Sequence, residues 1–371
     1  MPHRTLSEFA LIARYFQRPN PLRHAVLGVG DDCALLQPPA GELLAISTDT
    51  LVAGRHFFDD VEPATLGHKA LAVNLSDLAA SGAQPLACTL ALTVPAVDDA
   101  WLAAFARGLY ALVDASGCEL IGGDTTRGPL SITLTVWGSV PQGQALLRSG
   151  ARAGDDIYVS YRAGQGLGDA RLALHLLQAQ RVQMADDAAM TVIAALDESR
   201  RGELLQATRH RLEMPEPRIA LGLALRGVAC ACMDISDGLQ GDICHILHAS
   251  GVGATLHAVS DEAAPFADAV GYAGTNTDAA RHGLLAASSP ALRSLGAASA
   301  MSYVLAGGDD YELLFTASPE QRARILQIAR QTGLHLTRIG CIDSESGLRL
   351  RQMDGRCVCI SANGFDHFAA R

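Results

Sequence analysis

The most informative segment of this sequence is Ala72-Val73-Asn74-Leu75-Ser76-Asp77-Leu78-Ala79-Ala80. Its leucines repeat with a helical period and lie on one face, whereas Asn74 and Asp77 lie together on a polar face. Asp77 is within about two turns of Gly82, at the helix end where the dipole disfavours a negative charge. No arginine is near in sequence, so a metal ion would supply the counter-charge. The alternative is a solvated aspartate on an ordinary surface helix.

Five further clusters combine aspartate with glycine, serine or threonine. They are Gly30-Asp31-Asp32, Ser47-Thr48-Asp49-Thr50, Gly122-Gly123-Asp124-Thr125-Thr126, Asp234-Ile235-Ser236-Asp237-Gly238 and Gly307-Gly308-Asp309-Asp310. One such cluster is an ordinary turn. Six in one chain predict that carboxylates gather around hard cations, because Mg²⁺ takes oxygen ligands and neighbouring carboxylates need a counter-charge. A magnesium site in turn suggests a bound phosphate chain.

Two of these clusters follow apolar runs that we expect to be buried strands. Ser47-Thr48-Asp49 follows residues 43–46, so its hydroxyls and carboxylate would lie at a strand end, where side chains can present ligands. Gly122-Gly123 follows a second such strand, and two glycines let the backbone approach a phosphate closely.

The remaining clusters have plain structural explanations beside the functional one. Turn chemistry accounts for Gly30-Asp31-Asp32, and a hairpin turn accounts for residues 307–310. N-capping of a helix explains one of Asp234 and Asp237, but not both. The run Gly164-x-Gly166-x-Gly168 is only a weak signal of phosphate binding, because its spacing is not that of a dinucleotide-binding fold.

The composition restricts the class of protein. A chain of 371 residues is too long for one typical core, so two domains are expected. The formal net charge is −10 and no basic run is present, which argues against binding to nucleic acid or an anionic membrane. Lys69 is the single lysine among 29 basic residues, which excludes a P-loop and the Val-Ala-Ile-Lys strand of protein kinases. Metal ions, rather than a positive field, would then meet an anionic substrate.

The cysteines and the N-terminus bear on the location of the protein. The nine cysteines are odd in number and lack Cys-x-x-Cys units, so neither a disulfide framework nor a structural zinc site is expected. Reduced thiols indicate the cytoplasm. The N-terminus has no continuous apolar stretch, and no segment reaches the length needed to span a membrane.

Helix and strand patterns predict an α+β protein with mixed or antiparallel sheets flanked by helices. The polar stretch 148–154 is expected to join two domains, residues 1–150 and residues 151–371. The expected helices include one capped by Ser7, 63–81, 98–116, a helical region over 178–215, and 319–332. The expected strands include 86–94, 132–136, 155–159 and 312–316.

Taken together, the clusters resemble the thiamine-monophosphate kinases, a family of the PurM-like (aminoimidazole ribonucleotide synthetase-like) superfamily. The matching stretches occur in the family's order and are residues 27–34, 47–57, 72–80, 121–128, 234–239, 307–313 and 363–368. The resemblance implies a two-domain PurM-like fold whose N-terminal domain binds ATP and Mg²⁺ and forms a homodimer. It also implies ATP-dependent phosphorylation of thiamine monophosphate to thiamine diphosphate.

The resemblance assigns three groups of residues, position by position. The ligands of several Mg²⁺ ions would be Asp32, Ser47, Thr48, Asp49, Asp77, Asp124, Asp234 and Asp237. The ATP contacts would be Tyr110, Gly123, Asp124, Arg148 and Ser236. The contacts to thiamine monophosphate would be His56, Asp309 and Phe365. Glutamate usually stands at the position of Asp309 in this family, so that contact is expected to be shorter or water-mediated.

Three of these residues also have structural alternatives. His56 would serve as a structural histidine, Arg148 as an ordinary ion pair at the domain joint, and Phe365 as a core side chain.

The expected chemistry is direct in-line phosphoryl transfer without a catalytic nucleophile. Two anions must meet, and metal ions held by carboxylates would neutralise both of them. The acceptor phosphate is already ionised, so no strong base is needed. The alternatives are another ATP-dependent PurM-like enzyme, a metal-dependent phosphohydrolase and a non-catalytic ATP-binding scaffold.

Overall fold

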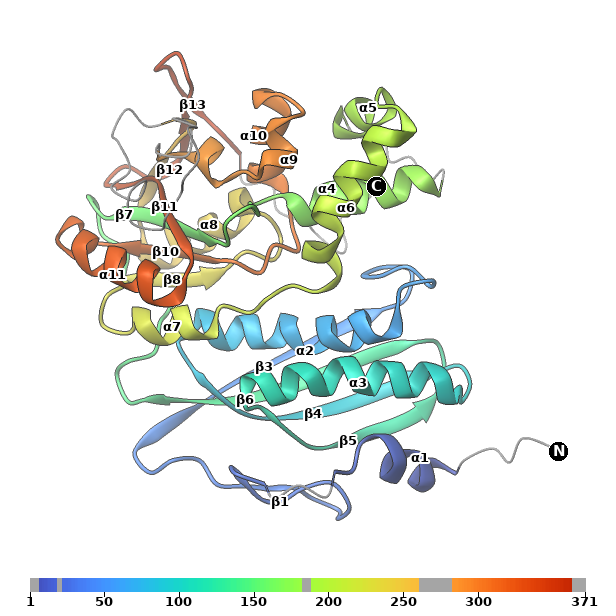
Figure 1. Cartoon of the computed structure of the whole chain (residues 1–371). Helices are drawn as coiled ribbons and strands as arrows, with labels where there is room; N and C mark the ends of the chain where they lie inside the picture. The colour runs from blue at the N-terminus through green and yellow to red at the C-terminus, as the bar shows by residue number, and fades with distance from the viewer. Residues whose placement is uncertain (1–6, 19–21, 182–187, 260–281, 362–371) are drawn as a thin grey trace. The chain divides into compact units, whose positions relative to one another are not determined.

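The computed structural model describes residues 7–18, 22–181, 188–259 and 282–361. Its contacts divide the chain into two compact units, Met1–Ala145 and Leu146–Arg371 (Figure 1). Each unit combines a sheet with helices, so the predicted α+β class is confirmed. None of the described helices has both the length and the apolar character needed to cross a bilayer.

The first unit is built on a four-stranded sheet in the order β3-β6-β4-β5. β3 (Glu42–Val52), β6 (Ser131–Pro141) and β4 (Gln84–Val94) pair in antiparallel fashion, and β5 (Glu119–Arg127) runs parallel to β4. A parallel pair needs a crossover connection, which α3 (Asp99–Ser116) supplies. The sheet is therefore mixed, as predicted.

Helices α2 (Pro63–Ala80) and α3 lie side by side over one face of this sheet (Figure 1). Their backbones are in close contact: a Cβ on Gly67 would lie 2.1 Å from the carbonyl oxygen of Phe105. The sequence predicted both helices, and their observed ends differ by one residue. The unit is completed by α1 (Glu8–Tyr15) and by a small ladder of β1 (Ala25–Leu27) and β2 (Leu35–Leu36).

Two expectations about strand ends in this unit are wrong. The strand expected at residues 43–46 continues to Val52, so Ser47-Thr48-Asp49 lies inside β3 rather than after it. Ile46, just before this segment, is apolar and yet 60% exposed. The reason is that β3 is an edge strand and a helix covers one of its two faces. Gly122 and Gly123 likewise lie inside β5. Pairing with β6 and β4 continues through these polar and glycine residues, because the ladder bonds use backbone groups that polar residues and glycine also carry.

The second unit is built on a seven-stranded sheet in the order β13-β12-β9-β11-β7-β10-β8. The strands are β7 (Asp156–Tyr161), β8 (Ala231–Asp234), β9 (Gly253–His257), β10 (Leu313–Ala317), β11 (His335–Asp343), β12 (Gly347–Arg351) and β13 (Cys357–Cys359). Every neighbouring pair is antiparallel except β9 and β12, which are parallel.

The helices of the second unit pack on this sheet and on one another. α8 (Leu239–Ser250) and α10 (Ala297–Ala306) contribute their apolar residues to the main core with β7, β9 and β10. α4 (Asp169–Gln180) packs against α6 (Glu198–Glu213), and α11 (Arg322–Thr332) packs against α7 (Ile219–Leu225). The shorter helices are α5 (Ala188–Ala194) and α9 (Pro290–Arg293). The helix predicted at residues 319–332 begins as a 3-10 turn, Pro319–Gln321.

Candidate functional site

In the first unit, α2 and β3 hold three of the predicted metal ligands close together. The hydroxyl of Ser47 donates a hydrogen bond of 2.5 Å to Oδ2 of Asp77. The side-chain oxygen of the buried Asn74, one turn earlier on α2, accepts the backbone N–H of Asp49 at 3.0 Å. Asn74 also donates to the carbonyl oxygen of Ala70 at 3.1 Å, which fixes its orientation. These bonds attach the strand to the polar face of the helix that the sequence indicated.

The electrostatics of this place suit a cation. Asp77 lies in the last turn of α2, and that turn contains no basic residue. The negative end of the helix dipole therefore adds to the charge of the carboxylate. Hydroxyl and carboxylate oxygens are the ligands that hard divalent cations prefer.

The sheet register places other predicted ligands on the opposite face. One row of cross-strand partners is Asp49, Leu134, Leu90 and Gly123, and the next row is Thr50, Thr133, Ala91 and Asp124. Successive residues of a strand point to opposite faces, so Asp49 and Asp124 point away from each other. Thr48 shares the face of Asp124, and its hydroxyl lies 2.9 Å from the hydroxyl of Thr135.

A closed metal cage is not present in the described ranges: no three Asp, Glu, His or Cys side chains there lie close enough to hold a metal ion. The Ser47–Asp77 pair with Asp49 is a smaller group of oxygens. Mg²⁺ commonly takes only one or two protein carboxylates, with water and substrate phosphates completing its shell. The residues on this face therefore fit a magnesium ion that is shared with a phosphate.

Asp32 and His56 lie in connecting segments of the same unit. Asp32 is exposed, and its backbone N–H donates to the carboxylate of Asp31 at 2.8 Å, as the turn chemistry predicted. Nδ1 of His56 accepts the backbone N–H of Val52 at 2.9 Å. The neutral imidazole then carries its proton on Nε2, which becomes a donor.

Two residues assigned to ATP have strong structural roles. Gly123 has a φ of 147°, and a Cβ there would lie 1.9 Å from the carbonyl oxygen of Leu90, so β5 approaches β4 too closely for any side chain.

Tyr110 is buried and donates to the carbonyl oxygen of Phe16 at 2.8 Å, while the guanidinium of Arg18 lies 3.5 Å above its ring. Burial raises the pKa of Tyr110 to about 12. Its ring and hydroxyl are both engaged within the protein, so the observed contacts of Tyr110 are structural.

In the second unit, the predicted residues 234–238 connect β8 to α8. Asp234 ends β8 and is buried. The backbone N–H groups of Ser236 and Asp237 both donate to Oδ2 of Asp242, at 3.0 and 3.2 Å. Burial, together with the charge of Asp237, raises the pKa of Asp242 to about 7. Asp242 was not among the predicted site residues, although an acid in the first turn of a helix is a recognisable capping signal.

The turn at residues 307–311 lies against this segment. The backbone N–H groups of Asp309 and Tyr311 donate to the carbonyl oxygens of Ser236 and Ile235, each at 2.8 Å. The structure thus brings Asp309 beside Ser236. The expected hairpin turn is wrong, because the segment connects α10 to β10 and no strand precedes it.

In the glycine run at residues 164–168, backbone N–H groups are hydrogen-bonded to carboxylates of the protein itself. The N–H of Gly166 donates to Asp169 at 2.9 Å, and the N–H of Gly168 donates to both carboxylate oxygens of Asp310, at 3.0 and 2.9 Å. A Cβ on Gly166 would lie 2.2 Å from the backbone nitrogen of Ser289, so packing explains that glycine. The N–H groups of Gly166 and Gly168 therefore already have acceptors within the protein and do not form a phosphate site.

Two assigned residues remain. Arg148 is exposed, and its carbonyl oxygen accepts the hydroxyl of Ser250 at 3.4 Å. Phe365 lies outside the described residues.

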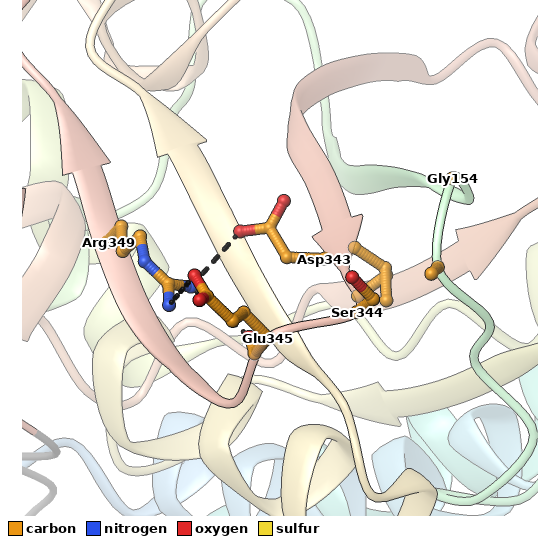
Figure 2. Close-up of a pocket in the computed structure, with 7 residues that line it drawn as sticks. Gly154, Asp343, Ser344, Glu345 and Arg349 are labelled. Carbon is orange, nitrogen blue, oxygen red and sulfur yellow. Dashed lines mark hydrogen bonds and ion pairs between the residues drawn. The ribbon is translucent and has the colours of Figure 1, made fainter.

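A pocket of about 600 Å³ in the second unit contains none of the predicted site residues. It is lined by Ala153, Gly154, Ile342, Asp343, Ser344, Glu345 and Arg349. Figure 2 shows that the guanidinium of Arg349 reaches both Asp343 and Glu345, at 3.3 and 3.2 Å. Its cation is therefore paired with carboxylates, and the pocket is not the candidate site.

Comparison with known proteins extends over both units. Residues 30–140 match the N-terminal domain of the AIR synthase related proteins, and residues 186–352 match their C-terminal domain. The chain is 45% identical over 365 residues to the thiamine-monophosphate kinase of Salmonella typhimurium strain LT2, which covers 98% of each chain.

Two solved structures give the same result. The crystal structure of thiamine-monophosphate kinase from Stenotrophomonas maltophilia K279a superposes with a TM-score of 0.71 and 41% identity, over 93% of this chain and 94% of that one. The structure of AaThiL complexed with AMPPCP and TMP superposes with a TM-score of 0.64 and 26% identity, over 90% of this chain and 89% of that one.

Proposed function

This chain belongs to the thiamine-monophosphate kinases of the AIR synthase related family, and from this membership we propose that it transfers the γ-phosphoryl group of ATP to thiamine monophosphate, forming thiamine diphosphate. The observation that carries the proposal is the likeness to kinases of this name, which extends over both units. An ATP analogue and TMP are bound together in one of those relatives.

Each unit contains proposed oxygen ligands of Mg²⁺ ions. The Ser47–Asp77 pair and Asp49 support this in the first unit, and Asp234 and Asp237 are the corresponding acids of the second. Asp32, Thr48 and Asp124 remain proposed ligands. Bound Mg²⁺ would neutralise phosphate oxygens and stabilise the charge of the transferred group.

The chain's own side chains would orient the two substrates. The Nε2–H of His56 is a donor suited to the substrate phosphate, and its Nδ1 bond to Val52 supports a fixed ring. Asp309 would contact the thiamine moiety, and Gly123, Asp124, Arg148 and Ser236 would contact ATP. Phe365 remains a proposed substrate contact. The acceptor phosphate is ionised at neutral pH, so direct in-line transfer needs no protein nucleophile.

The first unit would also form a homodimer through the open face of its sheet. On that face, Leu44 and Ile46 are 42% and 60% exposed, which supports burial against a second copy. Ile46→Glu should shift the mass measured by light scattering from dimer to monomer. Met353→Glu, at a residue of the second unit that is 69% exposed, is the matched control and should leave the dimer intact. A monomeric wild-type protein would contradict the proposal.

Free thiols at all nine cysteines support a cytoplasmic location.

The deciding experiment measures ADP formation with a panel of phosphorylated acceptors, with and without Mg²⁺. We expect ADP and thiamine diphosphate in equal amounts with thiamine monophosphate, and none of either after chelation of the metal. Turnover with a different monophosphate, and none with thiamine monophosphate, would mean that the substrate is that other compound. Phosphate release without any acceptor would indicate a phosphohydrolase.

A further inference from the structure

The turn at residues 307–311 is strained at two of its positions. Asp309 and Tyr311 have φ values of 62° and 50°, and they are the two non-glycine residues with positive φ in the described ranges. A bulky residue such as tyrosine rarely adopts this conformation. Strain of this kind persists only where the surroundings impose it, and it is concentrated at functional sites.

Asp310, between the two strained residues, is fully buried and anchors the turn. Its carboxylate accepts the N–H of Gly168, and its carbonyl oxygen accepts Nη2 of Arg211 at 2.6 Å. Arg211 is itself paired with the buried Glu312 at 2.9 Å. On the other side, the turn is bonded to the carbonyl oxygens of residues 235 and 236. Both sides of the turn are therefore fixed.

The strained conformation brings two side chains together. The hydroxyl of Tyr311 donates to Oδ1 of Asp309 at 3.1 Å, and both side chains are half-buried. A carboxylate that accepts this bond is restricted in its rotation, because turning away would break the bond. The restriction acts on a residue proposed above to contact the substrate.

We propose that Tyr311 is a positioning residue: its hydroxyl holds the carboxylate of Asp309 in the orientation that receives thiamine monophosphate. This assignment rests on the proposed function of the protein. Asp310 and its partners keep the turn in the conformation that makes the Tyr311–Asp309 bond possible.

The test is Tyr311→Phe, which removes the hydroxyl and keeps the ring. The KM for thiamine monophosphate should rise about tenfold, the effect of losing one hydrogen bond to a charged group. The KM for ATP should stay within about twofold, because only the Asp309 contact is altered. Tyr158→Phe is the matched control in the same unit: the Tyr158 hydroxyl donates to Asp156 at 3.2 Å, and its loss should change neither KM.

A double-mutant cycle then separates positioning from stability. In an Asp309→Asn background, Tyr311→Phe should add little to the KM, since both substitutions act on one contact. Additive effects, an equal rise in both KM values, or a fall in Tm well beyond that of Tyr158→Phe would each overturn the assignment. So would an unchanged KM in an active protein. If the wild-type protein does not phosphorylate thiamine monophosphate at all, the proposed function fails first, and the assignment fails with it.

Discussion

Ser47 on β3 and Asp77 on α2 share a hydrogen bond of 2.5 Å between residues 30 positions apart in the chain. The bond turns one carboxylate oxygen of Asp77 toward the strand that carries Asp49. Asn74 secures the same junction through the backbone of Asp49. The polar face of a mostly buried helix is thus directed at the edge strand, and Asp77 on that face is a proposed oxygen ligand.

Asp77→Asn should lower turnover by on the order of 100-fold or more, because the charge that would hold Mg²⁺ is removed. The amide oxygen can still accept the Ser47 hydroxyl, so the Tm should stay close to that of the wild type. Steady-state ADP formation and thermal unfolding measure the two effects. Asp114→Asn, at an exposed aspartate of α3 paired with Arg18 at 2.8 Å, should leave turnover unchanged. If the variant unfolds instead, Asp77 has a structural role rather than a role in turnover.

Asn74→Ala should destabilise the first unit by about 1–3 kcal/mol, because the part-buried N–H of Asp49 loses its acceptor. Urea unfolding measures this loss. Thr65→Ala removes an exposed side-chain bond to the carbonyl oxygen of Glu62 on the same helix, and should cost no more than about 0.5 kcal/mol. Equal losses of unfolding free energy in the two variants would mean that the bond between Asn74 and Asp49 stabilises the unit no more than an exposed hydrogen bond does.

Gly123→Ala should prevent the first unit from folding normally, because the new Cβ would lie 1.9 Å from a backbone oxygen. The neighbouring Gly122→Ala places its Cβ 3.6 Å from the methyl group of Thr89, an ordinary contact, and should fold. Soluble yield and circular dichroism distinguish the two variants. A well-folded Gly123→Ala protein with a raised KM for ATP would instead favour a role for Gly123 in nucleotide binding alone.

Tyr110→Phe should lower stability by about 1 kcal/mol, since the hydroxyl bonded to Phe16 is lost. The KM for ATP should not change, because the ring and the hydroxyl are both engaged within the protein. Thermal unfolding and ATP titration test this together. A rise in the KM for ATP without a loss of stability would return Tyr110 to the nucleotide site.

Asp169 should make stability depend on pH. Burial raises its pKa to about 6, above the ordinary value of 3.8. Well below pH 3.8 the carboxyl is protonated in both states. As the pH rises from 4 to 6, the unfolded chain releases this proton and the folded chain retains it. The folded state therefore loses stability through this window, by on the order of 3 kcal/mol in total.

Asp169→Asn removes this titration and keeps an oxygen for the N–H of Gly166. The Tm of the variant relative to the wild type should therefore rise between pH 4 and pH 6 and then remain constant. A difference in Tm that does not vary with pH would contradict the raised pKa.

The helices and the overall class were predictable because their signals are local. The leucine period around Asn74 and Asp77 predicts a helix and its polar face, and α2 has both. The strand that contains Asp49 was predicted too short, since an edge strand with one open face carries polar residues that read as a turn. The partners of Asp310 were not predictable, because Gly168 and Arg211 lie on other elements, far away in the chain.

By itself, the sequence determined the family, the α+β class and a chemistry of oxygen ligands in a chain with one lysine. Each of these is read from composition or from residues close together, which backbone geometry relates directly. Only the tertiary structure decided that Asp49 and Asp124 lie on opposite faces of one sheet, and that Tyr311 bonds to Asp309 within a strained turn. Strand register and buried anchors depend on contacts between distant segments, and these contacts form only when the chain folds.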